Sequence, residues 1–149
     1  MTNRNHFPKS GAPFLVRERR SAVRIQPRKN DPIRIDLNGE NFLDIVYAVD
    51  ISTGGLGLWV PHHFEGCKID SLVDCLVRLP YPISSSFHAQ GSIRHIRGNC
   101  FGLKFHNLHE NAKNLIKKYI EYRLKDISWL AWITHRMGLL SITSRILNW

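Results

Sequence analysis

The chain has 149 residues, enough for one compact domain with a hydrophobic core, alone or with an appendage. Its hydrophobic fraction of 43% and charged fraction of 22% are those of an ordinary globular protein. The apolar run at residues 129–133 is far too short for a membrane span, and the run at residues 14–16 is too short for the core of a signal peptide. The sequence therefore predicts neither a membrane span nor a signal peptide, and we expect a cytoplasmic protein.

The formal net charge of +9 is distributed unevenly along the chain. Residues 1–34 contain nine lysines and arginines but two acidic residues, a net charge of +7, which leaves +2 for the other 115 residues. A basic N-terminal arm on a nearly neutral body indicates an anionic partner. Nucleic acid, a nucleotide and an acidic membrane surface all remain open at this point.

The N-terminal residues 1–16 are polar, contain Pro8, Gly11 and Pro13, and show no sustained periodicity. We interpret them as a flexible arm. Residues 32–37 then alternate between apolar and polar side chains, as in a strand with one buried face.

Asn38-Gly39 is a strong hairpin signal, and residues 41–51 are predicted to return as the partner strand. Further short strands are predicted at residues 55–60, 71–79, 87–96 and 100–105, the last two joined by a turn at Gly98-Asn99. About six short strands joined mostly by hairpins indicate a mainly β fold, a small six-stranded antiparallel barrel, rather than alternating strands and helices.

The pattern changes to helical at Asn107, which we predict to be the N-cap of a helix, with Glu110 completing a capping box. Apolar side chains then recur at helical spacing. They are Leu115, Ile116, Tyr119, Ile120, Leu124 and Ile127, with Leu130, Ile133, Met137 and Leu140 as a continuation and Gly138 as an interruption. The predicted division is an arm at 1–16, a barrel with its closing helix at 17–124 and a helical extension at 125–149.

The turn "DISTGG" at residues 50–55 carries an acid and a hydroxyl two residues apart. Asp50 can accept paired N–H donors such as those of a guanine, and Ser52 can donate to a ring nitrogen or a phosphate oxygen. Gly54 and Gly55 tolerate positive φ and let a ligand approach the backbone. The alternative is a turn in which these side chains satisfy their own backbone.

The stretch "RERRSAVR" at residues 17–24 holds four arginines. Arg20 and Arg24 each offer a planar fork that matches a phosphate or the O6/N7 edge of guanine and also stacks on a base. The alternative for this stretch by itself is a solvated basic linker.

Together the two stretches resemble the paired RxxxR and (D/N)xSxxG motifs of PilZ domains, bacterial receptors for the second messenger cyclic di-GMP. The motifs are Arg20-x-x-x-Arg24 and Asp50-x-Ser52-x-x-Gly55. The resemblance extends over roughly residues 17–124 and implies a six-stranded barrel with a C-terminal helix.

The resemblance implies a role for each motif residue. Arg20 and Arg24 would hold the phosphates and guanine edges of cyclic di-GMP. Asp50 and Ser52 would read guanine from the barrel side, and Gly55 would leave room for it. No catalytic residue, metal or cofactor is expected beside this ligand.

The same resemblance implies expectations for two further positions. Arg19, which precedes the first motif arginine, favours binding of a stacked ligand pair. His95 is placed where some relatives set an aromatic ring against a base, although solvent exposure is the commoner outcome for a strand histidine. Binding would order the arm across the barrel and create a surface for an unknown downstream partner. No process such as motility or biofilm formation is singled out by these residues.

Alternatives from other classes are a small-barrel nucleic-acid binder and a protein-binding adaptor with a vestigial ligand site. Nucleic-acid binders of this shape place several aromatics on one sheet face. Here Tyr47, Trp59, Phe101 and Phe105 lie in apolar runs that indicate a core instead. The intact arginines argue against the adaptor. We expect no enzyme, since no nucleophile–base pair is recognisable.

The remaining signals are weaker. Cys67, Cys75 and Cys100 are predicted to be buried free thiols in a reducing compartment. The histidines lack metal-ligand spacing. The Trp- and Leu-rich C-terminus, with Trp129 and Trp132, predicts a homodimer contact in preference to a membrane-surface helix.

Overall fold

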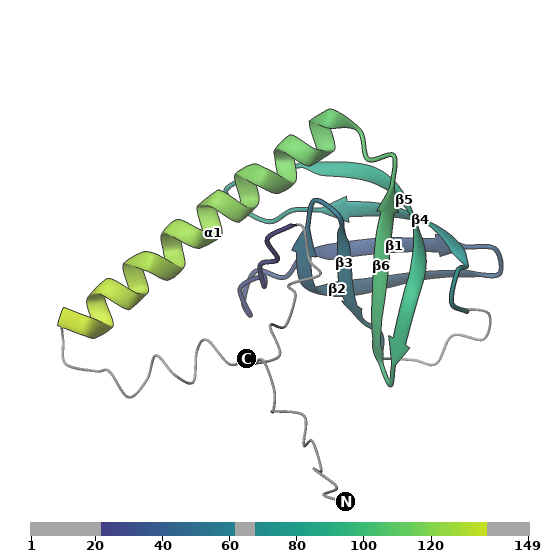
Figure 1. Ribbon diagram of the computed structural model, residues 1–149, viewed down its shortest axis with the longest axis horizontal. Helices are drawn as coiled ribbons and strands as arrows, with labels where there is room; N and C mark the ends of the chain where they lie inside the picture. The colour runs from purple at the N-terminus through teal and green to yellow at the C-terminus, as the bar shows by residue number, and fades with distance from the viewer. Residues whose placement is uncertain (1–21, 62–67, 137–149) are drawn as a thin grey trace, which may run out of the picture.

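The computed structural model describes residues 22–61 and 68–136 (Figure 1). Within them, six antiparallel strands close into a barrel in the order β1-β2-β3-β6-β5-β4, and one helix follows, as the sequence predicts. The elements are β1 Arg34–Gly39, β2 Phe42–Ser52, β3 Gly55–Trp59, β4 Leu72–Arg78, β5 Ser86–Arg97, β6 Cys100–His106 and α1 Glu110–Arg136. The predicted arm at 1–16, Arg19 and Arg20 lie outside the described residues.

Alternating side chains build the core of the barrel. Ile33, Ile35 and Leu37 are all buried, which confirms the face predicted for this segment. They pack against inward side chains of the other strands, such as Val46 and Val77. Each such aliphatic side chain contributes roughly 1.5–3 kcal/mol on burial, so the closed barrel is the main source of stability.

The first hairpin has its turn two residues later than predicted. Gly39 pairs with Phe42, so Glu40 and Asn41 form the turn and Asn38-Gly39 remains in β1. A Cβ at Gly39 would lie 2.0 Å from a ring carbon of Phe42. Glycine is therefore needed here for the aromatic ring that packs over the strand, and not for the turn itself.

Helix α1 begins later than predicted as well. Asn107 has a positive φ of 45° and lies outside the helix. The imidazole Nδ1 of His109 accepts a hydrogen bond from the backbone N–H of Asn111 at 3.3 Å, so His109 caps the helix. The predicted capping box at Asn107 is wrong because the chain needs this left-handed residue to turn from β6 into α1.

The first half of α1 packs on the barrel against β2 and β5, and its C-terminal half projects past the strands (Figure 1). Ile116 and Tyr119 are buried, but Leu124, predicted to continue the apolar face, is 46% exposed. The helix continues through residues 124 and 125 without a break, so its backbone does not mark the domain boundary predicted there. That boundary remains a prediction.

Three side chains predicted to be buried lie outside the barrel. Tyr47 and Trp59 are register partners on β2 and β3 and are 48% and 47% exposed. Cys100, the register partner of Trp59 on β6, is also exposed, whereas Cys75 is buried as predicted. Strand alternation places all three on the outer face of the barrel.

Among the described residues, no helix has the length and hydropathy required to span a bilayer. Over the same residues, no cluster of three or more histidine, cysteine, aspartate or glutamate side chains is arranged to hold a metal ion.

Candidate functional site

The turn between β2 and β3 places the acidic motif at one end of the barrel. Ser52 pairs with Gly55, and its hydroxyl accepts a hydrogen bond from the Gly54 N–H at 3.2 Å while donating to the Gly55 carbonyl at 3.4 Å. The side chain of Ser52 is buried. In this conformation the hydroxyl therefore stabilises the turn.

Gly55 is required for the close approach of two strands. A Cβ at Gly55 would lie 2.1 Å from the carbonyl oxygen of Leu103 on β6, whereas a Cβ at Gly54 would meet only the Ser52 hydroxyl, at 3.8 Å. Neither glycine has a positive φ. The contact that excludes a side chain at Gly55 is thus with the neighbouring strand of the barrel.

Asp50 points outward at the end of β2, where a bulge follows Ala48. Its Oδ1 accepts hydrogen bonds from the guanidinium of Arg24 at 2.8 Å and from the backbone N–H of Gly57 at 3.1 Å. A Cβ at Gly57 would lie 3.1 Å from the carboxylate, so the missing side chain leaves space for Asp50. Neither contact uses Oδ2.

Arg24 reaches Asp50 because the segment before β1 pairs with β2. Ile25 forms a β-bridge with Ile51, and each N–H donates to the other's carbonyl at 3.0 Å. Ile25 is also buried in the core. This anchor fixes the neighbouring Arg24 beside the neighbouring Asp50, although the two residues are 26 positions apart in sequence.

His95 lies in the same row of the barrel surface. Asp50 pairs with Gly57, Gly57 with Gly102, and Gly102 with His95, across β2, β3, β6 and β5. The ring of His95 covers Gly102, where a Cβ would lie 1.9 Å from a ring carbon. Asp50 and His95 thus lie at the two ends of this row, and the two positions between them are glycines without side chains.

The structure therefore brings the predicted residues Arg24, Asp50, Ser52 and Gly55 together at one end of the barrel. The sequence did not predict that Gly57 and Gly102 lie side by side next to them. The signal was present in "GLGLW" and "CFGLKF", where Gly57 and Gly102 occupy outward positions, but strand register was needed to align them. Arg19 and Arg20 stay predictions, since they lie outside the described residues.

Chemically, this surface combines a hydrogen-bond acceptor with a planar cationic donor. The carboxylate of Asp50 suits paired N–H groups, and the guanidinium of Arg24 suits phosphate oxygens or a base edge. Both side chains are partly exposed, at 27% and 29%, so a solute can reach them.

Comparisons with known proteins agree with this geometry. A family model for the PilZ domain matches residues 18–122. The fold is similar to the PilZ domain of YcgR from Escherichia coli, solved with c-di-GMP, with a TM-score of 0.63 and 16% identity over 76% of this chain and 98% of that chain. A comparison with curated protein sequences found no match.

The fold is also similar to the Bacillus subtilis inhibitor of motility MotI/DgrA, with a TM-score of 0.61 and 15% identity over 72% of this chain and 52% of that one. A third similar structure is MrkH, described as a c-di-GMP-dependent transcription regulatory factor. Its TM-score is 0.60, with 14% identity over 71% of this chain and 51% of MrkH. This chain thus spans about half the length of MotI and MrkH. The family match, together with the closed six-stranded barrel and its C-terminal helix, shows that this chain belongs to the PilZ domain family.

Proposed function

We propose that this protein is a non-catalytic receptor for cyclic di-GMP that binds its ligand at Arg24 and Asp50. One observation carries the proposal: the two motifs converge, with the Arg24 guanidinium 2.8 Å from the Asp50 carboxylate on the barrel surface. The similar structures of YcgR, solved with c-di-GMP, and of MrkH, a c-di-GMP-dependent regulatory factor, support the choice of ligand.

In the proposed complex, the ligand replaces a contact that already exists. Asp50 accepts the N1–H and amino group of one guanine, and Arg24 turns its fork to a phosphate or to the guanine edge. The Arg24–Asp50 pair is partly exposed, and such pairs contribute about 0–1 kcal/mol, so exchanging it costs little. Ser52 acts through the turn that its hydroxyl stabilises.

We further propose that binding fixes the N-terminal segment across the barrel. Arg19 and Arg20 would converge with Arg24 on the phosphates, and a dianionic ligand removes the repulsion between these cations. A stacked ligand pair would supply acceptors for all three arginines. Comparing hydrogen exchange of residues 17–24 with and without ligand tests this step, and unchanged exchange contradicts it.

The test of the binding proposal is calorimetric titration of cyclic di-GMP into the wild-type protein and Asp50→Ala, with GTP as the ligand control. We expect micromolar or tighter binding by the wild type and strongly weakened binding by the variant. Asp74→Ala is the matched control, because Asp74 is an exposed aspartate on β4, which borders neither β2 nor β3. No heat for the wild type, or equal loss in both variants, contradicts the proposal.

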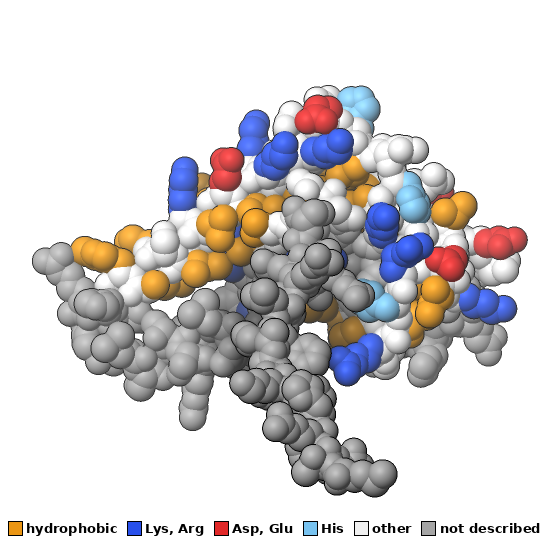
Figure 2. Space-filling model, in the orientation of Figure 1, with side chains coloured by type: hydrophobic (Ala, Val, Ile, Leu, Met, Phe, Trp, Pro, Cys, Tyr) orange, Lys and Arg blue, Asp and Glu red, His pale blue; other side chains and the backbone are white. Residues whose placement is uncertain are grey.

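We propose that the C-terminal half of α1 forms a homodimer contact, while the downstream partner stays unknown. Figure 2 shows hydrophobic side chains along this helix, and Trp129, Leu130 and Trp132 are each exposed by more than 40%. A second copy of the chain is the proposed occupant, because burying such indoles favours association. Sedimentation of the wild type and Trp129→Lys tests this contact, and a monomeric wild type at high concentration rules it out.

A second candidate function is binding of single-stranded nucleic acid. Tyr47 and Trp59 are adjacent and exposed on the outer face, where aromatic rings stack on bases in such proteins. This function predicts steeply salt-dependent oligonucleotide binding that is lost in Trp59→Ala and retained in Asp50→Ala. The opposite sensitivity favours the cyclic di-GMP receptor.

A further inference from the structure

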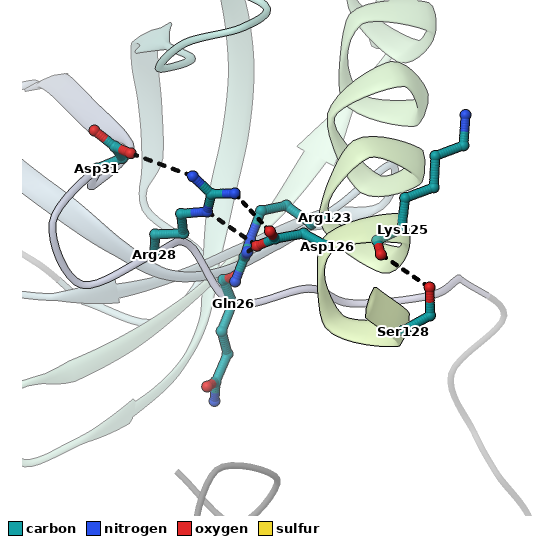
Figure 3. Close-up of polar contacts among 7 residues, drawn as sticks. All are labelled: Gln26, Arg28, Asp31, Arg123, Lys125, Asp126 and Ser128. Carbon is teal, nitrogen blue, oxygen red and sulfur yellow. Dashed lines mark hydrogen bonds and ion pairs between the residues drawn. The ribbon is translucent and has the colours of Figure 1, made fainter. Parts of the chain in front are cut away.

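The segment that carries Arg24 is held at a second place, on helix α1 (Figure 3). Arg28 contacts both carboxylate oxygens of Asp126, with Nη2 at 2.7 Å from Oδ1 and Nε at 3.0 Å from Oδ2. The guanidinium of Arg28 also lies over the ring of Tyr122, 5.3 Å from its centroid. A two-point pair of this kind fixes orientation as well as distance.

Arg123 joins the same cluster from within α1. Its Nε donates to the backbone carbonyl of Gln26 at 3.2 Å, and its Nη1 donates to Oδ2 of Asp126. Arg123 is 9% exposed, so its charge is compensated inside the protein by these two acceptors. We call Gln26, Arg28, Arg123 and Asp126 the α1 clamp.

The α1 clamp and the candidate ligand site are close in the chain. Only Ile25 separates Arg24 from Gln26, and the Ile25–Ile51 bridge sits directly beside Asp50. Pro27 restricts the backbone between the two clamp residues of this segment. A movement of residues 26–28 on α1 must therefore shift the bridge or strain it, and either change displaces Arg24 from Asp50.

We propose that Asp126 is a positioning residue for Arg24, acting through the α1 clamp. This inference rests on the proposed function for its ligand, but the positioning itself does not require ligand. By linkage, any partner that pulls α1 away from residues 26–28 weakens ligand binding, and ligand opposes that partner by the same factor. Helix α1 is thereby coupled to the candidate ligand site, and its C-terminal half extends past the barrel.

The test uses the full chain with Asp126→Asn, which keeps the side-chain shape and removes the charge. Hydrogen exchange of residues 22–31 without ligand reports the positioning, and titration of cyclic di-GMP reports its consequence. We expect faster exchange at Ile25 and about 5- to 10-fold weaker binding, in the range of typical coupling between sites. Glu110→Gln is the matched control, since Glu110 pairs with Lys113 on the same helix and touches neither end of the clamp.

Each outcome decides the proposal. Exchange equal to the wild type overturns the clamp, and faster exchange with unchanged affinity overturns the positioning role. A wild type that binds no cyclic di-GMP contradicts the proposed function instead, and exchange then decides the clamp by itself. If Asp126→Asn does not fold, Arg28→Lys, which keeps the charge but loses the two-point contact, takes the same two measurements.

Discussion

Residues 22–31 are tied to the folded body by two ion-pair contacts of different kinds. At the ligand end, Arg24 meets Asp50 through one oxygen, and the two side chains are 29% and 27% exposed. At the helix end, Arg28 makes a two-point contact with Asp126, and these two side chains are 37% and 19% exposed. Arg123, whose side chain is 11% exposed, joins the same carboxylate from within α1. The two ends therefore differ in the number of hydrogen bonds and in the nearly buried Arg123 of the second, which makes the second contact harder for water to replace.

Under the proposed function, this difference lets one short segment serve both stability and binding. A single exposed ion pair is readily exchanged for a ligand phosphate, whereas a cluster that compensates a nearly buried guanidinium is not. Residue composition is similar at both ends, so burial and the number of contacts separate the two roles. Four experiments with substituted proteins test this division, taken from the largest expected effect to the smallest.

Gly55→Ala tests whether the motif glycine belongs to the ligand end or to the barrel. Because its Cβ would lie 2.1 Å from the Leu103 carbonyl, we expect β3 and β6 to be forced apart at a cost of about 3 kcal/mol in unfolding free energy. Gly54→Ala, the neighbouring control, should change stability by less than about 0.5 kcal/mol. Denaturant unfolding measures both, and equal stability of the two variants refutes the barrel role.

Arg24→Ala should separate binding from stability at the ligand end. Loss of one charged fork, worth roughly 1.5–3 kcal/mol, predicts about 10- to 100-fold weaker binding of cyclic di-GMP. Unfolding free energy should fall by less than about 1 kcal/mol, since only an exposed pair is lost. Arg34→Ala, which removes another exposed ion pair, with Asp36, is the control and should leave affinity unchanged. A comparable loss in both variants would show nonspecific charge attraction.

Asp126→Asn and Asp50→Asn compare the two ends directly by the same isosteric change. Asp126→Asn should lower unfolding free energy by about 1–3 kcal/mol, because Arg123 is left poorly compensated where it is largely buried. Asp50→Asn should cost less than about 1 kcal/mol. Urea denaturation at pH 7 distinguishes them, and the reverse ranking would assign the structural role to the ligand end.

Tyr119→Phe probes the packing beneath the α1 clamp. The Tyr119 hydroxyl is buried, with no hydrogen-bond partner in the described part of the chain, and burial raises the pKa of this phenol above its usual value near 10. The folded protein therefore favours the neutral phenol of Tyr119. The free energy of unfolding keeps its full value below pH 10 and falls as the pH rises from there towards the folded pKa. We expect the variant to be as stable as the wild type at pH 7, or slightly more so, and to lose less stability between pH 9 and 11. A destabilised variant at pH 7 would reveal a partner for the hydroxyl.

Local patterns were sufficient for most of the fold. The alternation of Ile33, Ile35 and Leu37 predicts an inward face, and Gly98-Asn99 predicts the last hairpin turn, because both depend on neighbouring residues alone. The two sequence motifs likewise indicate Arg24 and Asp50 without reference to any contact between them. Predictions failed where a distant partner decides, as at Gly39, which accommodates the ring of Phe42.

The candidate site divides in the same way. Residue types and spacing identify a carboxylate, a hydroxyl and arginines suited to a nucleotide, since that chemistry is carried by the side chains themselves. Strand register decided that Gly57 and Gly102 lie between Asp50 and His95, and the docking of α1 decided that Arg28 meets Asp126, 98 positions away. Contacts of this kind depend on how the closed barrel and its helix pack together. Because that packing involves the whole chain at once, no short stretch of sequence reveals it.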